Sequence, residues 1–214
     1  MKAHSRNNKE QHEEFLCQIG EGSTAHKEAV EWFQMLPVWL DLPGLRVVHA
    51  CWYAPAQRML QPFLDRSQRF TKAGLREASR RDSEAYHAAE ILLKGPEAPL
   101  PGGHPPFKDK QGHTRHELRL RWWDPGSTTF RKAALGMNGE EAGLPDLPVT
   151  TEHHYAEQIP VFFGHYWLQG TPAISGDYAA CLDFSVAKQG FLTAYRWSGE
   201  TRLSAHNIVY VNAN

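Results

Sequence analysis

The chain has 214 residues, of which 41% are hydrophobic and 22% charged, and its net charge is −1. This length is sufficient for one domain with a sizeable core, and the composition is ordinary for a globular protein. Because positive and negative charges nearly balance, no overall electric field attracts the chain to nucleic acid or to a membrane surface.

The positions of the cysteines and the polar N-terminal sequence predict a cytoplasmic protein. Cys17, Cys51 and Cys181 are an odd number at scattered positions, and the last two lie in apolar segments. We expect those two to be buried free thiols, which indicates a reducing compartment rather than a disulfide framework. The N-terminus is polar, and no apolar stretch approaches the roughly 18 residues of a membrane span. The sequence therefore predicts neither an export signal nor a membrane partner.

The first half of the chain is predicted to be mainly helical. Its expected elements are helices over 5–19 and 23–36, paired strands over 38–42 and 45–50, and a helical insert over 56–93. Apolar residues at helical spacing predict the helices, and Pro37 is expected to stop the second. The turn Pro43-Gly44 separates the two strands. The insert is expected to break near Thr71 and Asp82.

The second half is predicted to consist mainly of strands and loops. Its expected elements are surface loops over 94–113 and 136–160, a half-buried strand over 116–123, and strands over 161–163, 179–184, 191–197 and 207–212. In the half-buried strand, alternation predicts Leu118, Leu120 and Trp122 on the inner face and Trp123 on the solvent face. Helices come early and strands late, so the predicted fold class is α/β or α+β with a mixed β-sheet.

Two histidines follow the clearest strand signals. His49 follows the apolar run Leu45–Val48, and His165 follows the run Val161–Gly164. In open α/β sheets, functional groups collect at the carboxyl ends of strands, so the two imidazoles could converge on one metal ion. We therefore expect neighbouring or nearly neighbouring strands, with both rings at the same edge of the sheet. The alternative is a pair of core histidines satisfied by backbone carbonyl groups.

Several segments resemble the calcineurin-like metallophosphoesterases, in the bacterial branch related to diadenosine tetraphosphatases and Ser/Thr protein phosphatases. They are Leu36–Trp52, Leu92–Glu97, Pro160–Trp167, Ala180–Lys188 and Leu192–Trp197. The resemblance runs over nearly the whole chain. It implies a single domain over 1–214 with a mixed-sheet core, the insert included. It also implies a metal-dependent phosphoester hydrolase, acting as a phosphatase or a nucleoside-polyphosphate hydrolase on a phosphorylated small molecule or a nucleotide.

Three motifs of that family are absent from this sequence: Asp-x-His, Gly-Asp-x-x-Asp-Arg-Gly and Gly-Asn-His-Glu. The opening Met1–His12 resembles the stretch that follows the third motif, so the chain resembles the C-terminal portion of such an enzyme. With the N-terminal part of the fold missing, we expect weak or absent hydrolysis. We also expect Val47, Val48, Phe162 and Phe163 to line an uncovered apolar face, so that the chain aggregates or forms a homodimer.

The resemblance also implies roles for individual residues, although none of them is catalytic in itself. The complete enzyme would hold two divalent ions, with manganese as the leading candidate and iron, zinc or nickel as the others. His49 and His165 would ligate one of these ions. Asp183 is expected to orient a ligand histidine, or alternatively to cap its own turn before Ser185. Lys188 is expected to meet a substrate phosphate, or alternatively to be an exposed hairpin lysine.

A basic and aromatic segment offers a function from a different class. It consists of Arg115, Arg119, Arg121 and Arg131 with Trp122 and Trp123. Arg121 is the candidate for holding a nucleotide base or phosphate beside the metal site. Similar patches bind single-stranded nucleic acid, so the chain could instead be a non-catalytic fragment or pseudoenzyme that binds nucleotides or nucleic acid. The remaining alternative is an amphipathic strand with a solvated basic face.

Overall fold

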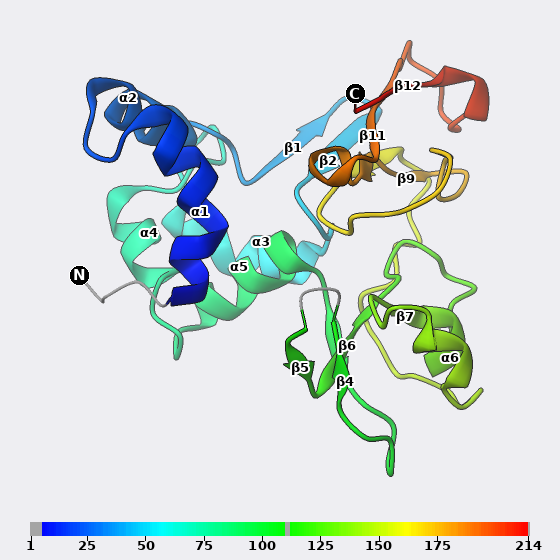
Figure 1. Cartoon of the computed structure of the whole chain (residues 1–214). Helices are drawn as coiled ribbons and strands as arrows, with labels where there is room; N and C mark the ends of the chain where they lie inside the picture. Colours follow the sequence, from blue (N-terminus) through cyan, green and yellow to red (C-terminus); the bar gives the residue numbers. More distant parts are fainter. Residues whose placement is uncertain (1–5, 110–111, 214) are drawn as a thin grey trace.

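A computed structural model describes residues 6–109 and 112–213 (Figure 1). Its helices are α1 (Arg6–Ile19), α2 (Thr24–Gln34), α3 (Ala54–Leu60), α4 (Lys72–Glu77), α5 (Glu84–Lys94) and α6 (Phe130–Ala133), with 3-10 turns η1 (Gln61–Phe63), η2 (Glu140–Gly143), η3 (Val186–Lys188) and η4 (Ala205–Asn207). The segment Met1–Ser5, which begins both the resembling stretch and the first expected helix, lies outside the described residues. Helices α1 to α5 lie together on one side of the molecule (Figure 1).

The strands form four small sheets. They are β1 (Trp39–Leu42), β2 (Leu45–Val48), β3 (Glu97–Pro99), β4 (Phe107–Lys108), β5 (Thr114–Arg115), β6 (Glu117–Leu120), β7 (Ala134–Leu135), β8 (Val161–Phe163), β9 (Ala179–Cys181), β10 (Asp183–Phe184), β11 (Phe191–Tyr195) and β12 (Ile208–Asn212). The largest sheet has the order β1-β2-β8-β9, and the others are β10-β11-β12, β3-β6-β7 and β4-β5. In the largest sheet β1 runs antiparallel to β2, whereas β2, β8 and β9 are parallel. The prediction of a mixed α/β architecture is thereby confirmed.

The helical insert is confirmed as three short helices, and side-chain caps explain where they begin. The Oγ1 atom of Thr71 accepts a hydrogen bond from the Gly74 N–H at the start of α4. The Oγ atom of Ser83 accepts one from the Tyr86 N–H at the start of α5. Each cap satisfies a backbone donor that has no partner within its helix. The breaks expected near Thr71 and Asp82 are therefore helix N-termini.

Two predicted strands differ in the structure. The strand expected over 116–123 is only β6, because the chain turns after Leu120, where the Trp122 N–H donates to the Leu120 carbonyl and the Asp124 N–H to the Arg121 carbonyl. Trp123, expected on the solvent face, is 6% exposed and packs in the core. The segment 179–184 is divided between β9 and β10, which belong to different sheets. The surface loop expected over 94–113 contains β3, which pairs with β6, and β4.

The main core lies between the largest sheet and helices α3 and α5. It contains Leu60 and Leu92 from these helices and Phe163 from β8, and all three are buried. On the other face of β8, Phe162 is buried beside Leu203 and contacts the ring of Tyr195, with 4.9 Å between ring centroids. The expectation of an uncovered apolar face is therefore wrong, because Val48, Phe162 and Phe163 are buried and Val47 is partly buried.

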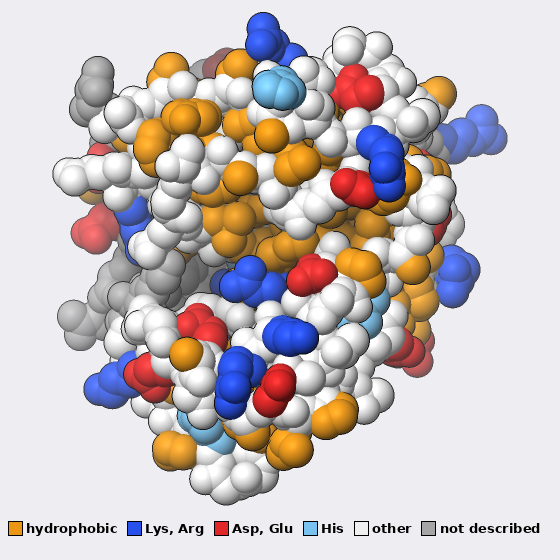
Figure 2. Space-filling model, turned by 90° about the vertical axis from the view of Figure 1, so that its right-hand side faces the viewer, with side chains coloured by type: hydrophobic (Ala, Val, Ile, Leu, Met, Phe, Trp, Pro, Cys, Tyr) orange, Lys and Arg blue, Asp and Glu red, His pale blue; other side chains and the backbone are white. Residues whose placement is uncertain are grey.

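The surface carries both signs of charge. Figure 2 shows one face of the molecule, on which acidic and basic side chains are interspersed and hydrophobic side chains gather across the middle. This pattern agrees with the net charge of −1, since no single sign dominates that face. Within 6–109 and 112–213, no helix combines the length and the apolar character needed to cross a membrane.

Candidate metal site at a histidine pair

His49 and His165 are brought together by two adjacent parallel strands. In the register of β2 and β8, Val47 lies opposite Phe162, so both strands end at the same edge of the sheet. His49 directly follows β2, and His165 is the second residue after β8. The centroids of their imidazole rings are 5.2 Å apart, with 59° between the ring planes. The expectation of neighbouring strands with both rings at one edge is confirmed.

The backbone between the two strand ends is closely connected. The Gly164 N–H donates to the His49 carbonyl at 2.9 Å, which extends the pairing of β2 and β8 by one step. His165 has a φ of 74°, in the left-handed region that residues with a side chain rarely adopt. Such strain is maintained only where the surrounding structure determines it, and it is frequent at functional sites. The turn after β8 thus carries the His165 side chain back toward β2.

Trp122 links the residues that follow the two histidine positions. Its indole N–H is shared between the Ala50 carbonyl and the Tyr166 hydroxyl oxygen, each at 2.9 Å. The Trp122 side chain is fully buried. The sequence placed it correctly on the inner face, but its bridging role depends on segments far apart in the chain. A single buried donor therefore positions both histidine-bearing segments.

The imidazole of His165 lies in a setting that favours its neutral form. Its Nε2 atom is buried without a hydrogen-bond partner. The pKa of His165 is lowered to about 3, mainly by desolvation and in addition by the positive charges of Arg119, His49 and Lys94. A neutral imidazole keeps a lone pair available for a metal ion. The alternative of histidines satisfied by backbone carbonyls does not hold for this Nε2 atom.

The pKa of His49 is also shifted in the direction that favours the neutral form, although His49 is exposed to solvent. Desolvation lowers the pKa of His49, while the negative charge of Asp183 acts in the opposite direction. The Asp183 carboxylate itself accepts hydrogen bonds from the Ser185 N–H at 3.1 Å and the Trp167 N–H at 3.3 Å. The bond from the Ser185 N–H is the cap of its own turn that was the alternative role expected for Asp183. Asp183 therefore acts on His49 through its charge and anchors the segment after His165.

The cation that lowers the pKa of His165 is Arg119, two residues before the expected Arg121. Arg119 lies on β6 and is paired with Glu97, with 3.6 Å between its Nε and a carboxylate oxygen. Lys94 is a second cation that the sequence analysis did not single out. Lys94 is the last residue of α5 and lies in the segment Leu92–Glu97. The resemblance of that segment to the calcineurin-like family was the feature of the sequence that could have pointed to Lys94.

The expected basic and aromatic patch is not formed as a stacking surface. Trp122 and Trp123 are 0% and 6% exposed, and both rings contact Phe163 with centroids 4.8 Å apart. Nucleic-acid bases need exposed aromatic faces for stacking. These two tryptophans therefore offer no platform to a nucleic acid.

The donor set fits part of a metal shell. In the described part of the chain, no group of three or more His, Cys, Asp or Glu side chains is arranged to hold an ion. Cys51 and Cys181 are buried free thiols, as expected, and burial raises the pKa of Cys181 to about 12. Both thiols consequently remain protonated in the metal-free chain at neutral pH. What the chain offers a metal is the pair of imidazoles.

Comparison with known proteins identified no relative: no family model, no curated protein and no solved structure matches this chain. The resemblance to the calcineurin-like metallophosphoesterases rests on the sequence segments given above.

Proposed function

We propose that this chain contributes part of the metal centre of a calcineurin-like, metal-dependent phosphoester hydrolase. The observation that carries the proposal is the pairing of His49 and His165 at the ends of adjacent parallel strands, with ring centroids 5.2 Å apart. Two ligands of one ion must approach one another in this way. The buried, unpartnered Nε2 atom of His165 supports a ligand role, because an orphaned polar atom is otherwise costly.

The proposed centre holds two divalent ions in the complete enzyme, with manganese first and iron, zinc or nickel as alternatives. Such a pair of ions supplies a hydroxide nucleophile at neutral pH and neutralises the phosphoryl oxygens. Two imidazoles are fewer than the roughly three protein ligands of a catalytic site. We therefore assign the remaining carboxylate and amide ligands to the family motifs that this sequence lacks.

The surroundings of the pair are suited to an anionic substrate. Arg119 and Lys94 contribute positive charge near His165, and guanidinium and ammonium groups stabilise phosphate oxygens. The proposed substrate is accordingly a phosphorylated small molecule or a nucleotide. Lys188 and Arg121 remain candidates for further substrate contacts. The buried free thiols support a reducing, cytoplasmic location as part of the same proposal.

Titration of the metal-free chain with Mn²⁺ in a calorimeter tests the metal site directly. His49→Ala and His165→Ala should each weaken Mn²⁺ binding by at least about tenfold, since ligand or outer-shell losses cost that much. His206→Ala, an exposed histidine in η4, is the matched control and should bind Mn²⁺ as the unaltered chain does. Mn²⁺ binding that is unaffected by both site variants would contradict the proposed metal centre.

Turnover separates a phosphohydrolase from a non-catalytic binding module. The 214-residue chain should hydrolyse p-nitrophenyl phosphate with Mn²⁺ weakly or not at all, because its metal shell is incomplete. Adding a segment that carries the three absent motifs should raise the rate by orders of magnitude. If the completed protein binds Mn²⁺ and nucleotide yet does not hydrolyse any phosphoester, the binding-module alternative is the correct one.

A further inference from the structure

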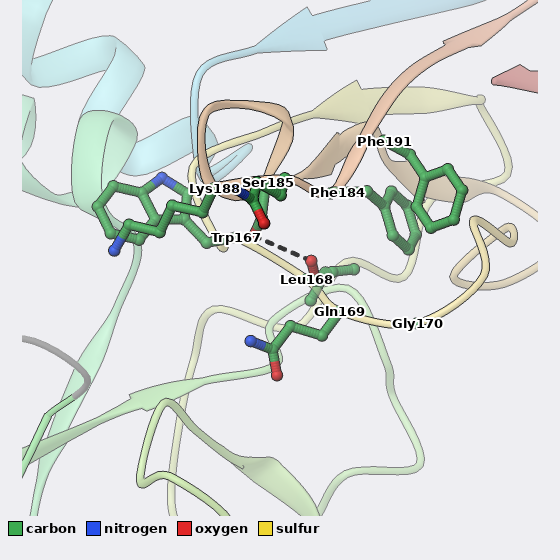
Figure 3. Close-up of a pocket in the computed structure, with 10 residues that line it drawn as sticks. Trp167, Leu168, Gln169, Gly170, Phe184, Ser185, Lys188 and Phe191 are labelled. Atoms are coloured by element: carbon green, nitrogen blue, oxygen red, sulfur yellow. Dashed lines mark hydrogen bonds between the residues drawn. The ribbon is translucent and has the colours of Figure 1, made fainter. Parts of the chain in front are cut away.

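A cavity of about 260 Å³ lies beside the segment that follows His165. Figure 3 shows its walls: Trp167 and Lys188 lie on one side, Phe184 and Phe191 on the other, with Leu168 and Gln169 between them. Of the residues given a role above, Lys188 lines this cavity, whereas His49, His165 and Asp183 do not. Its volume is slightly below the roughly 300 Å³ at which drug-sized pockets begin. The space therefore suits a single ring system rather than a large ligand.

The walls are held in place by the turn between β10 and β11. The Ser185 hydroxyl donates to the Leu168 carbonyl at 3.1 Å, a bond drawn in Figure 3, and so ties the turn to the segment after His165. The N–H groups of Lys188 and Gly190 both donate to the Ser185 carbonyl, at 2.8 and 3.0 Å. A cavity built in this way is formed before a ligand arrives, and preorganisation reduces the entropic cost of binding.

The chemistry of the walls favours a flat aromatic group. Phe184 and Phe191 present phenyl rings, and aromatic pairs prefer stacked or edge-to-face contacts. On the opposite side the Lys188 ammonium lies 4.2 Å from the centroid of the Trp167 ring, so the cavity has a cation at its margin. A ligand that carries an aromatic ring and a negative charge matches both sides.

The cavity adjoins the histidine pair. Trp167 is two residues from His165, so their Cα atoms are at most about 7 Å apart. Asp183 joins the two regions, because its carboxylate accepts the Trp167 N–H and its negative charge acts on His49. The wall of the cavity that carries Trp167 is therefore connected to the histidine pair through the short stretch of backbone from His165 and through Asp183.

We propose that this cavity binds the aromatic group of the phosphorylated substrate while the phosphate lies at the histidine pair. The inference rests on the proposed function and specifies its substrate class: a phosphoester whose alcohol part carries one flat ring system. A nucleoside phosphate and an aryl phosphate share this chemistry.

The first experiment measures ring binding without metal, by ligand-observed NMR and calorimetry with adenosine and with phenol. Adenosine or phenol should bind the unaltered chain, and Phe191→Ala and Trp167→Ala should each weaken that binding by about tenfold. Leu192→Ala is the matched control, because Leu192 is the next residue on β11 and is exposed. The stronger of the two ligands identifies the source of the ring as a nucleoside or an aryl group.

The second experiment measures the binding of ligands that carry both a ring and a phosphate, in the presence of Mn²⁺. Adenosine 5′-monophosphate or phenyl phosphate should bind about tenfold more tightly than ribose 5-phosphate, which has no aromatic ring, and Phe191→Ala should abolish the difference. Equal affinity for all three phosphates, or ring binding unaffected by both cavity variants, overturns the assignment of the cavity even where Mn²⁺ binds His49 and His165. If the ring ligands bind but Mn²⁺ does not, the assignment of the cavity as an aromatic site stands and the proposed phosphohydrolase function is overturned.

Discussion

Trp122 shows how one buried donor can determine the geometry of a site built from distant segments. Trp122→Phe retains an aromatic ring but removes the N–H shared by the Ala50 carbonyl and the Tyr166 hydroxyl. We expect the free energy of unfolding to fall by about 2 to 4 kcal/mol, since the acceptors lose their partner and the smaller ring leaves space. Mn²⁺ affinity should fall as well, because the two histidine segments lose their common anchor.

Urea denaturation measures this difference, with Trp32→Phe on the exposed surface of α2 as the control. The control variant should remain within about 0.5 kcal/mol of the unaltered chain. Equal stability of the two tryptophan variants would show that the shared indole bond contributes little.

Glu200 provides a test of pH dependence away from the site. Its carboxylate accepts hydrogen bonds from the Tyr195 hydroxyl at 2.7 Å, the Ser198 N–H at 2.8 Å and the Asn207 amide at 2.8 Å. These bonds, with that of Tyr195 the largest contribution, lower the pKa of Glu200 from 4.5 to about 2. The folded state therefore binds fewer protons than the unfolded state across this interval. The resulting stabilisation is present above pH 4.5 and is lost as the pH falls toward 2.

Glu200→Gln should consequently lower Tm at pH 7, and its difference from the unaltered chain should narrow between pH 4.5 and pH 2. Thermal unfolding followed by circular dichroism at several pH values measures this trend. Glu28→Gln, on the exposed surface of α2, serves as the control and should leave Tm unchanged. A Tm difference that is constant across the pH series would refute the role given to the Glu200 carboxylate.

At the scale of the elements, the turn between β10 and β11 leaves no room for a side chain at Gly190. A Cβ atom at Gly190 would lie 2.0 Å from the Phe184 carbonyl oxygen and 2.8 Å from that of Ser185. Because both neighbours are backbone atoms, Gly190→Ala should reduce the free energy of unfolding by about 1 to 3 kcal/mol, the usual cost of overpacking. Ligand binding in the adjoining cavity should weaken with it.

Gly102→Ala is the matched control for this turn, because its added Cβ would meet open space. Chemical denaturation of the two alanine variants compares them directly. If Gly190→Ala is as stable as Gly102→Ala, the turn is more pliable than its backbone contacts indicate.

At the scale of the whole molecule, one group of exposed apolar side chains lies on α2 and β1, and another lies on β11 and β12, where Leu192 and Val211 are 59% and 60% exposed. Trp32 and Met35 are 54% and 52% exposed, and no described side chain of α2 is buried. Apolar side chains also remain exposed at Phe33, Leu36, Leu40 and Leu42. Exposed apolar side chains promote association, so we expect a concentration-dependent homodimer through the side chains of α2.

Sedimentation velocity at several protein concentrations tests the association. Trp32→Glu combined with Met35→Lys should shift the chain toward the monomer, because charged groups resist burial in an interface. Met59→Lys changes an equally exposed methionine on α3 and should leave the association unchanged. A monomer at every concentration would exclude the homodimer.

Local patterns determined the strands and helices that carry the candidate site. The apolar runs before His49 and His165 are short, bounded by turn residues and rich in β-branched or aromatic side chains, a combination that favours strands. Adjacent parallel strands end at a common edge of the sheet. The prediction that the imidazoles of His49 and His165 lie close together therefore depended only on the two strands being neighbours. The caps at Thr71 and Ser83 are also local, because each acts within three residues of its own position.

Only the tertiary structure decided which side chains surround that pair. Alternation along a strand continues in the sequence after Leu120, but the chain turns there, with the Trp122 N–H donating to the Leu120 carbonyl, and Trp123 packs in the core. Arg119 and Lys94, rather than Arg121, are the cationic side chains that act on His165. Burial and electrostatic contacts depend on which distant segments pack together, and hydrophobic periodicity specifies a face without specifying what covers it.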